Sequence, residues 1–198
     1  MSTGRVEAFS DGVFAVAITL LVLDLRIPIT RGSLITALAD EWPVFVAFLL
    51  SFMVIGIVWV NHHTLFHQLQ FVDRPLLFFN LALLMTVVLI PFATSLFAQY
   101  VSVPGEQASV AAALFNGSQL VMGMAFQLCG SWVHAHPELR RPGSPVATPL
   151  QRLRTAAGVF FYVLCIPVAF VSPLAVLVID GAVAVYYVLD QFTLATAE

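Results

Sequence analysis

Long apolar stretches, separated by short connections, constrain this chain more than any other feature of its sequence. A helix needs about 20 apolar residues to cross the hydrocarbon core of a bilayer. Six stretches of roughly that length are present, at residues 7–27, 42–61, 76–99, 108–133, 155–171 and 173–190. The last two form one apolar stretch that only Ser172-Pro173 interrupts, so we expect a hairpin there between two segments of near-minimal spanning length.

This pattern predicts an all-α integral membrane protein, with residues 1–198 forming a single domain of six transmembrane helices. The composition agrees, because 60% of the residues are hydrophobic and 10% are charged, whereas soluble domains carry about 25% charged residues. The eight cationic residues are all arginines and form no basic run. Nucleic-acid binding therefore has no electrostatic basis.

The positions of the arginines predict the orientation in the membrane. In a six-helix topology, six of the eight arginines fall on the side that holds both termini, four of them in a long polar loop from His134 to Arg154. Only Arg26 and Arg31 fall on the other side. Because cytoplasmic segments carry the excess of positive charge, we predict that both termini are cytoplasmic.

A polar headpiece, RVEAFSD at residues 5–11, precedes the first apolar run directly. An ionisable residue inside a membrane is costly and faces protein or water with a partner, so Asp11 needs hydrogen-bond donors. Polar residues expected at the same depth are Trp59, Asn61, His62, His63 and Asn80. We interpret the set as a polar packing cluster that fixes helix geometry, with direct proton or ion handling as the alternative.

The rest of the first helix carries a narrow apolar stripe. At about 100° per residue, Leu20 and Leu23 fall about 40° and −20° from Val16. Thr19 borders the stripe at about −60°, whereas Ser10 and Asp11 fall on the far side. The first helix therefore has a hydrophobic stripe on one face and a polar pair on the opposite face, where contact with lipid would be energetically unfavourable.

Three groups of residues together resemble the transmembrane protein 175 family. They are Arg5-x-x-x-Phe9-Ser10-Asp11 before an aliphatic helix, Trp59-x-Asn61-His62-His63, and Asn80 followed by Pro91-Phe92-x-Thr94. The resemblance covers most of the chain and is densest over residues 5–94. It implies a potassium-permeable channel of endosomal, lysosomal or prokaryotic membranes. Family members lack a TVGYG pore loop, and this sequence contains none.

The resemblance also implies a pore lined by the first helix. Counted from the FSD motif, the constriction ring falls on Val16 and the next layers on Leu20 and Leu23, the residues that the stripe selects. Thr19 matches a hydroxyl position used in selectivity, so permeant potassium is expected near Val16, Thr19 and Leu20. FSD occurs once, as in prokaryotic members, which implies a homotetramer in a prokaryotic plasma membrane, with no cofactor and no fixed metal.

Three other interpretations compete with a channel. A secondary transporter of a small cation or proton usually has inverted repeats and broken helices; these segments show neither, and we interpret Asp180, a charge deep in a span, as structural. A hydrolase using Ser10 with His62 or His63 lacks a G-x-S-x-G turn, so we predict no enzymatic activity. His63 and His67 have zinc-like spacing, but no carboxylate or cysteine nearby completes a site.

Overall fold

Helices make up the architecture of this chain. The computed structural model describes residues 2–25, 33–103, 105–146 and 148–195, which form no strand beyond a single bridge between Leu69 and Arg140. The long helices are α1 Thr3–Leu20, α3 Trp42–His67, α4 Arg74–Tyr100, α5 Glu106–Ala135, α6 Pro149–Val171 and α7 Pro173–Ala195. A short helix, α2 Leu34–Asp40, and two 3-10 turns, η1 Leu21–Asp24 and η2 Pro137–Leu139, complete the described elements.

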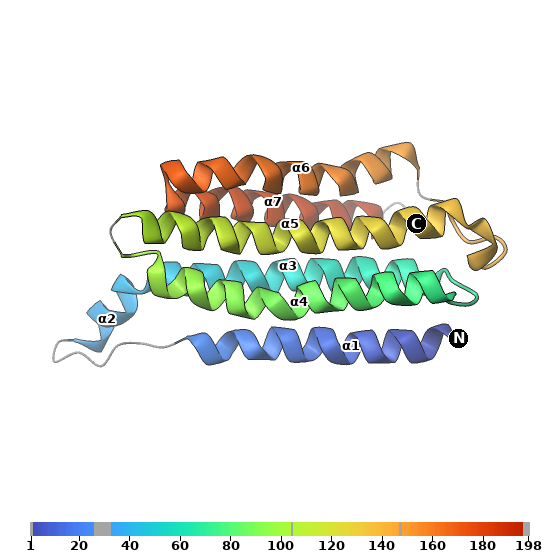
Figure 1. Ribbon diagram of the computed structural model, residues 1–198, viewed down its shortest axis with the longest axis horizontal. Helices are drawn as coiled ribbons and strands as arrows, with labels where there is room; N and C mark the ends of the chain where they lie inside the picture. Colours follow the sequence, from blue (N-terminus) through green and yellow to red (C-terminus); the bar gives the residue numbers. More distant parts are fainter. Residues whose placement is uncertain (1, 26–32, 104, 147, 196–198) are drawn as a thin grey trace.

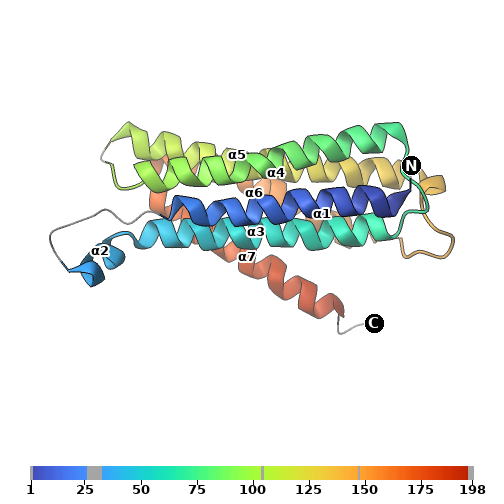
Figure 2. The same ribbon diagram turned by 90° about the horizontal axis from the view of Figure 1, so that it is seen from below.

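The long helices lie side by side in a bundle, with α1 at one edge and α6 at the opposite edge (Figure 1). In the described part of the chain, α1 packs against α3 and α4 and makes no contact with α5, α6 or α7. Helices α3, α5 and α6 each pack against α7. Towards its C-terminal end, α7 diverges from the axis of the other helices (Figure 2). The subunit therefore has one half built around α1 and another built around α7.

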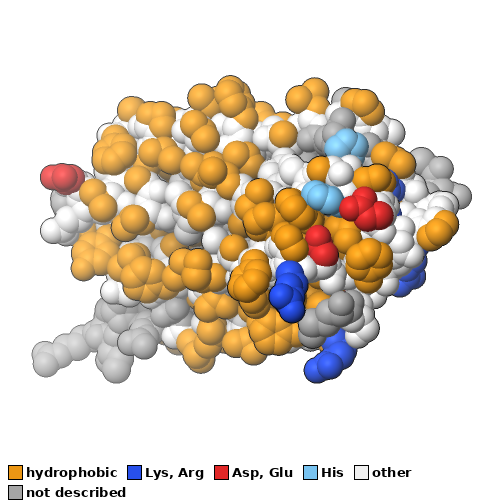
Figure 3. All heavy atoms as spheres, turned by 45° about the vertical axis from the view of Figure 1, so that its right-hand side comes forward, with side chains coloured by type: hydrophobic (Ala, Val, Ile, Leu, Met, Phe, Trp, Pro, Cys, Tyr) orange, Lys and Arg blue, Asp and Glu red, His pale blue; other side chains and the backbone are white. Residues whose placement is uncertain are grey.

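Five helices are long and apolar enough to cross a membrane, namely α1 with η1, α3, α4, α5 and the part of α6 from Leu153 to Val171. Helix α7 is apolar over the shorter stretch Pro173–Leu189. Large hydrophobic side chains remain exposed on every one of these helices, and they spread over the face of the bundle in Figure 3. An apolar outer surface of this extent fits a lipid environment.

Several element boundaries differ from those expected. Helix α1 begins at Thr3 and tightens into η1 from Leu21, and residues 26–27 of the expected first span lie outside the described residues. Helix α2 was not expected at all. The polar loop is shorter than His134 to Arg154 because α6 begins at Pro149. There the Thr148 hydroxyl accepts from the Gln151 backbone N–H and the Gln151 side chain accepts from the Thr148 N–H, a capping box that starts the helix in polar sequence.

The contact between α6 and α7 depends on Gly158. The Tyr187 hydroxyl donates a 2.8 Å hydrogen bond to the Arg154 carbonyl oxygen, and a Cβ at Gly158 would lie 2.5 Å from that hydroxyl. Gly158 therefore leaves the space that the tyrosine occupies. The break between the two helices lies at Ser172, the position expected for the hairpin.

We expect Gly158→Ala to destabilise the protein by about 1–3 kcal/mol, because the added methyl group displaces the tyrosine from a packed interface. Gly117→Ala is the matched control, since no atom lies within 4 Å of the Cβ it would add; there the better helix propensity of alanine favours stability by up to about 1 kcal/mol. Unfolding midpoints in detergent compare the two variants. Equal midpoints would contradict this role of Gly158.

Candidate functional site

A buried hydrogen-bonded chain joins α1, α4 and α3. The Asn80 amide nitrogen donates to the Ser10 hydroxyl oxygen at 3.0 Å, and the Asn80 carbonyl oxygen lies 2.8 Å from His62 Nε2. Because a carbonyl oxygen only accepts, this bond places a proton on Nε2. Among the described residues, His62 Nδ1 is buried without a hydrogen-bond partner. All three side chains are buried, so the chain fixes α1 against the two helices behind it.

Asp11 makes a separate contact nearer the surface. The Trp59 indole N–H donates to Asp11 Oδ1 at 2.8 Å, and Asp11 is half-buried. Trp59 and His62 lie three residues apart on one face of α3, so one helix face serves both polar residues of the headpiece. Together the two contacts hold the far side of α1, opposite its apolar stripe.

Of the five expected donors, Asn61 and His63 do not reach the headpiece in the described structure. The Asn61 amide donates to the carbonyl oxygen of Ile57 on its own helix at 2.9 Å. His63 is exposed, and its ring stacks on that of His67 with centroids 5.7 Å apart. Asn61 and His63 fall about 100° to either side of His62 on α3, and the His63 ring lies beside that of Trp59, with centroids 6.3 Å apart. No group of three His, Cys, Asp or Glu side chains suited to a metal ion occurs in the described ranges.

Asp11→Ala is expected to reduce assembly and to lower stability by about 1 kcal/mol, the lower end of the range for an orphaned donor, because Trp59 is partly exposed. Trp59→Phe should have a similar effect, whereas Asp11→Asn retains an acceptor oxygen and should be milder. Size-exclusion chromatography and unfolding midpoints measure both effects. Normal assembly of Asp11→Ala with changed ion selectivity would instead assign Asp11 to the permeation path.

The apolar stripe of α1 faces away from the rest of the chain. Val16, Leu20 and Leu23 are 57%, 38% and 66% exposed, and Thr19 between them is also exposed. Residues of the opposite face are buried against α3 and α4: Val6, Ser10, Phe14, Ala17 and Leu21. The Thr19 hydroxyl donates to the Val16 carbonyl oxygen at 2.8 Å, so its own oxygen presents lone pairs outward.

Arg5 and Phe9 belong to this exposed face and do not anchor α1 within the chain. Both are exposed, and the described structure gives Arg5 no hydrogen bond or ion pair. At about 100° per residue they fall about 20° to either side of Val16. These two residues therefore lie on the same side of the helical wheel as the stripe. A wheel that begins at the start of the helix predicts their exposure as well.

The fold and this site define an integral membrane protein whose first helix is held by a polar cluster on one side and presents an apolar face on the other. The family model of the endosomal/lysosomal potassium channel TMEM175 matches residues 5–91. A potassium channel of Streptomyces collinus is 42% identical over 202 residues, covering 99% of this chain and 96% of that protein. The chain belongs to the TMEM175 family, which comprises ion channels and not enzymes.

A solved structure and a human relative support the same assignment. The crystal structure of a lysosomal potassium-selective channel TMEM175 homolog from Chamaesiphon minutus matches with a TM-score of 0.81 at 34% sequence identity, covering 95% of this chain and 97% of that one. The human endosomal/lysosomal proton channel TMEM175 is 38% identical over 112 residues, which is 50% of this chain and 22% of the human protein. The prediction that the protein is not an enzyme agrees with this family, whose members are ion channels.

Proposed function

We propose that this protein is a potassium-permeable cation channel whose pore is lined by α1 from several subunits. The observation that carries the proposal is the exposed stripe of Val16, Leu20 and Leu23 on a helix whose other face is buried. One helix cannot enclose a pore, so each subunit contributes one copy. The names of the bacterial relatives, which are potassium channels, support potassium as the permeant ion.

We infer four subunits around one axis, in the plasma membrane of a prokaryote and with cytoplasmic termini. Cyclic symmetry brings equivalent residues to the same depth, so each stripe position forms a ring. The Arg5 side chain on the same face then lies at the cytoplasmic mouth. A C-terminal reporter that reads as cytoplasmic supports the six-span topology, and an extracellular reading contradicts it.

The rings of Val16, Leu20 and Leu23 act as filter and gate together in this proposal. An apolar ring offers an ion no ligands in place of water, so passage depends on how readily the ion sheds its shell. Potassium holds its shell less tightly than sodium, which yields a modest preference without a carbonyl cage. Hydrophobic constrictions also gate by dewetting. The outward lone pairs of Thr19 then provide the ligand oxygen nearest to the ring.

Recordings of the purified protein in planar bilayers under opposed potassium and sodium gradients test this function. We expect unitary current steps and a reversal potential displaced towards the potassium equilibrium potential. A secondary transporter, the alternative, would instead give counterflow that saturates with substrate and no unitary steps. Either result distinguishes the two classes of protein.

A further inference from the structure

Asp180 is a second buried carboxylate, far from the headpiece in sequence and structure. It lies near the middle of α7 with 0% exposure. The Asn116 amide nitrogen donates to Asp180 Oδ1 at 3.2 Å, and the Gln119 amide nitrogen donates to Asp180 Oδ2 at 3.2 Å. Both amides come from the middle of α5. This cluster belongs to the half of the subunit that α1 does not contact.

The described chain supplies no positive charge to this carboxylate. Helix α7 contains no arginine, lysine or histidine, and the cationic residues of α3, α5 and α6 lie towards the helix ends. The titratable groups that face Asp180 are the Tyr162 hydroxyl and the Cys165 thiol, both from α6. An ionised carboxylate without a counter-charge is costly in a low-dielectric bundle. Two amide donors do not remove that cost.

The same cluster contains two buried acceptor atoms that have no hydrogen-bond partner among the described residues. Asn116 Oδ1 and Gln119 Oε1 are both buried, and neither has a hydrogen-bond partner in the described structure. Turning either amide around would not help, because its carbonyl oxygen would then face the carboxylate and its nitrogen would lose its acceptor. An ionised Asp180 beside two unpaired amide oxygens is an environment that favours the binding of a cation.

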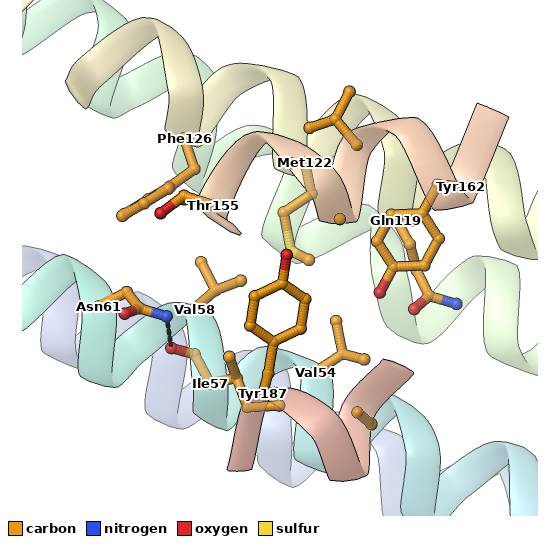
Figure 4. A pocket seen from close by; sticks show the side chains of 14 residues that line it. Val54, Ile57, Val58, Asn61, Gln119, Met122, Phe126, Thr155, Tyr162 and Tyr187 are labelled. Atoms are coloured by element: carbon orange, nitrogen blue, oxygen red, sulfur yellow. Dashed lines mark hydrogen bonds between the residues drawn. The ribbon is translucent and has the colours of Figure 1, made fainter. Parts of the chain in front are cut away.

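A cavity adjoins the cluster at Gln119. It has a volume of about 70 Å³ and lies between α3, α5, α6 and α7. Gln119 and Tyr162 lie at one end of it, and Asn61 and Thr155 lie at the other end (Figure 4). A water molecule needs about 10–15 Å³ of such space, so the cavity accommodates several. The cavity therefore places space for water beside the Gln119 amide.

We propose that Asp180, Asn116 and Gln119 form a cation site within each subunit, separate from the α1 surface, which binds a proton or Na⁺. A proton on Asp180 removes the charge, and the new O–H then offers a donor to an amide oxygen that turns towards it. Sodium compensates the charge by ligation to carboxylate and amide oxygens, and acidic residues inside membranes mark ion pathways and proton relays. The site does not depend on α1 lining a pore.

Modification by dicyclohexylcarbodiimide tests the site in full-length protein reconstituted in liposomes. This membrane-soluble reagent adds a protonated carboxylic acid across its C=N bond, and an acyl shift then leaves a stable N-acylurea that peptide mass spectrometry locates. For a proton site, labelling of Asp180 should fall as pH rises, whatever the sodium concentration. For a sodium site, Na⁺ at about ten times its Kd should reduce labelling roughly tenfold relative to choline. Exposed Glu138 is the internal control.

Thermal unfolding of Asp180→Asn provides the second measurement. The amide is neutral and nearly isosteric, so its midpoint should not respond to pH or sodium through this site. The wild-type midpoint should rise as pH falls if the site binds a proton, or with added sodium if it binds Na⁺, and Asp11→Asn should retain that response. Asp180 that stays unlabelled at every pH and sodium concentration, or a wild-type midpoint that responds as Asp180→Asn does, would overturn the proposal. Neither outcome bears on conduction through α1.

Discussion

Asparagine at Val16 is expected to raise the unitary current and to weaken the preference for potassium over sodium. Each asparagine places an amide in an apolar ring, which gives water and ions hydrogen-bonding ligands at the narrowest point. Burying a polar group without a hydrogen bond costs about 0.5–2 kcal/mol on octanol scales, and we take this as the amount by which the asparagine lowers the barrier for an ion in the ring. We therefore expect a roughly twofold to thirtyfold increase in current, measured in planar bilayers. Leu20→Asn should act in the same direction.

Val22→Asn is the matched control for this prediction. Val22 is 53% exposed, close to the 57% of Val16, but it lies outside the stripe. The same substitution there should leave current and reversal potential unchanged. Thr19→Ala, recorded in the same way, should lower the potassium preference with a smaller effect on current. Unchanged permeation in all stripe variants, at Val16, Leu20 and Leu23, would place the pore elsewhere.

Alanine at Asn80 is expected to produce the largest loss of stability among the polar substitutions. Asn80 is buried and bonds to both Ser10 and His62, so its truncation leaves two buried polar groups unpaired. An orphaned buried group costs about 1–3 kcal/mol, which gives roughly 2–6 kcal/mol for this variant. Equilibrium unfolding in detergent micelles measures the loss. Gln99→Ala controls for removal of an amide from an exposed site on the same helix, where we expect a change within about 0.5 kcal/mol.

A double-mutant cycle separates the hydrogen bond from the cost of the orphaned groups. The coupling between Ser10→Ala and Asn80→Ala should be about 0.6 kcal/mol and at most about 1.7 kcal/mol, as for other interhelical bonds in membranes. It should be smaller than the single-variant loss, because truncation also includes the desolvation of His62. A zero coupling with full additivity would show that Asn80 does not hold α1 through Ser10.

The sequence alone was sufficient for the features that depend on local periodicity. Apolar length predicts the membrane helices because every backbone polar group must be satisfied within the helix in lipid. The 3.6-residue period separates the stripe of Val16, Leu20 and Leu23 from Ser10 and Asp11 on α1, and the structure places those two groups on opposite faces. The length of a helix and the direction of its side chains are properties of that helix and of the lipid around it, so neither inference requires knowledge of its neighbours.

Features that depend on contacts between helices required the tertiary structure. The sequence offers five polar residues at the depth of the headpiece as its possible partners. Only the packing of the helices shows that Trp59 bonds to Asp11 and that Asn80 links Ser10 to His62. The sequence shows Asp180 as an isolated charge in a span; its two amide neighbours on α5, and their unpaired oxygens, are visible only once α7 is placed against that helix. The reason is physical. Periodicity fixes which side of a helix a residue occupies, but the rotation and depth of a neighbouring helix decide which atoms come within hydrogen-bonding distance.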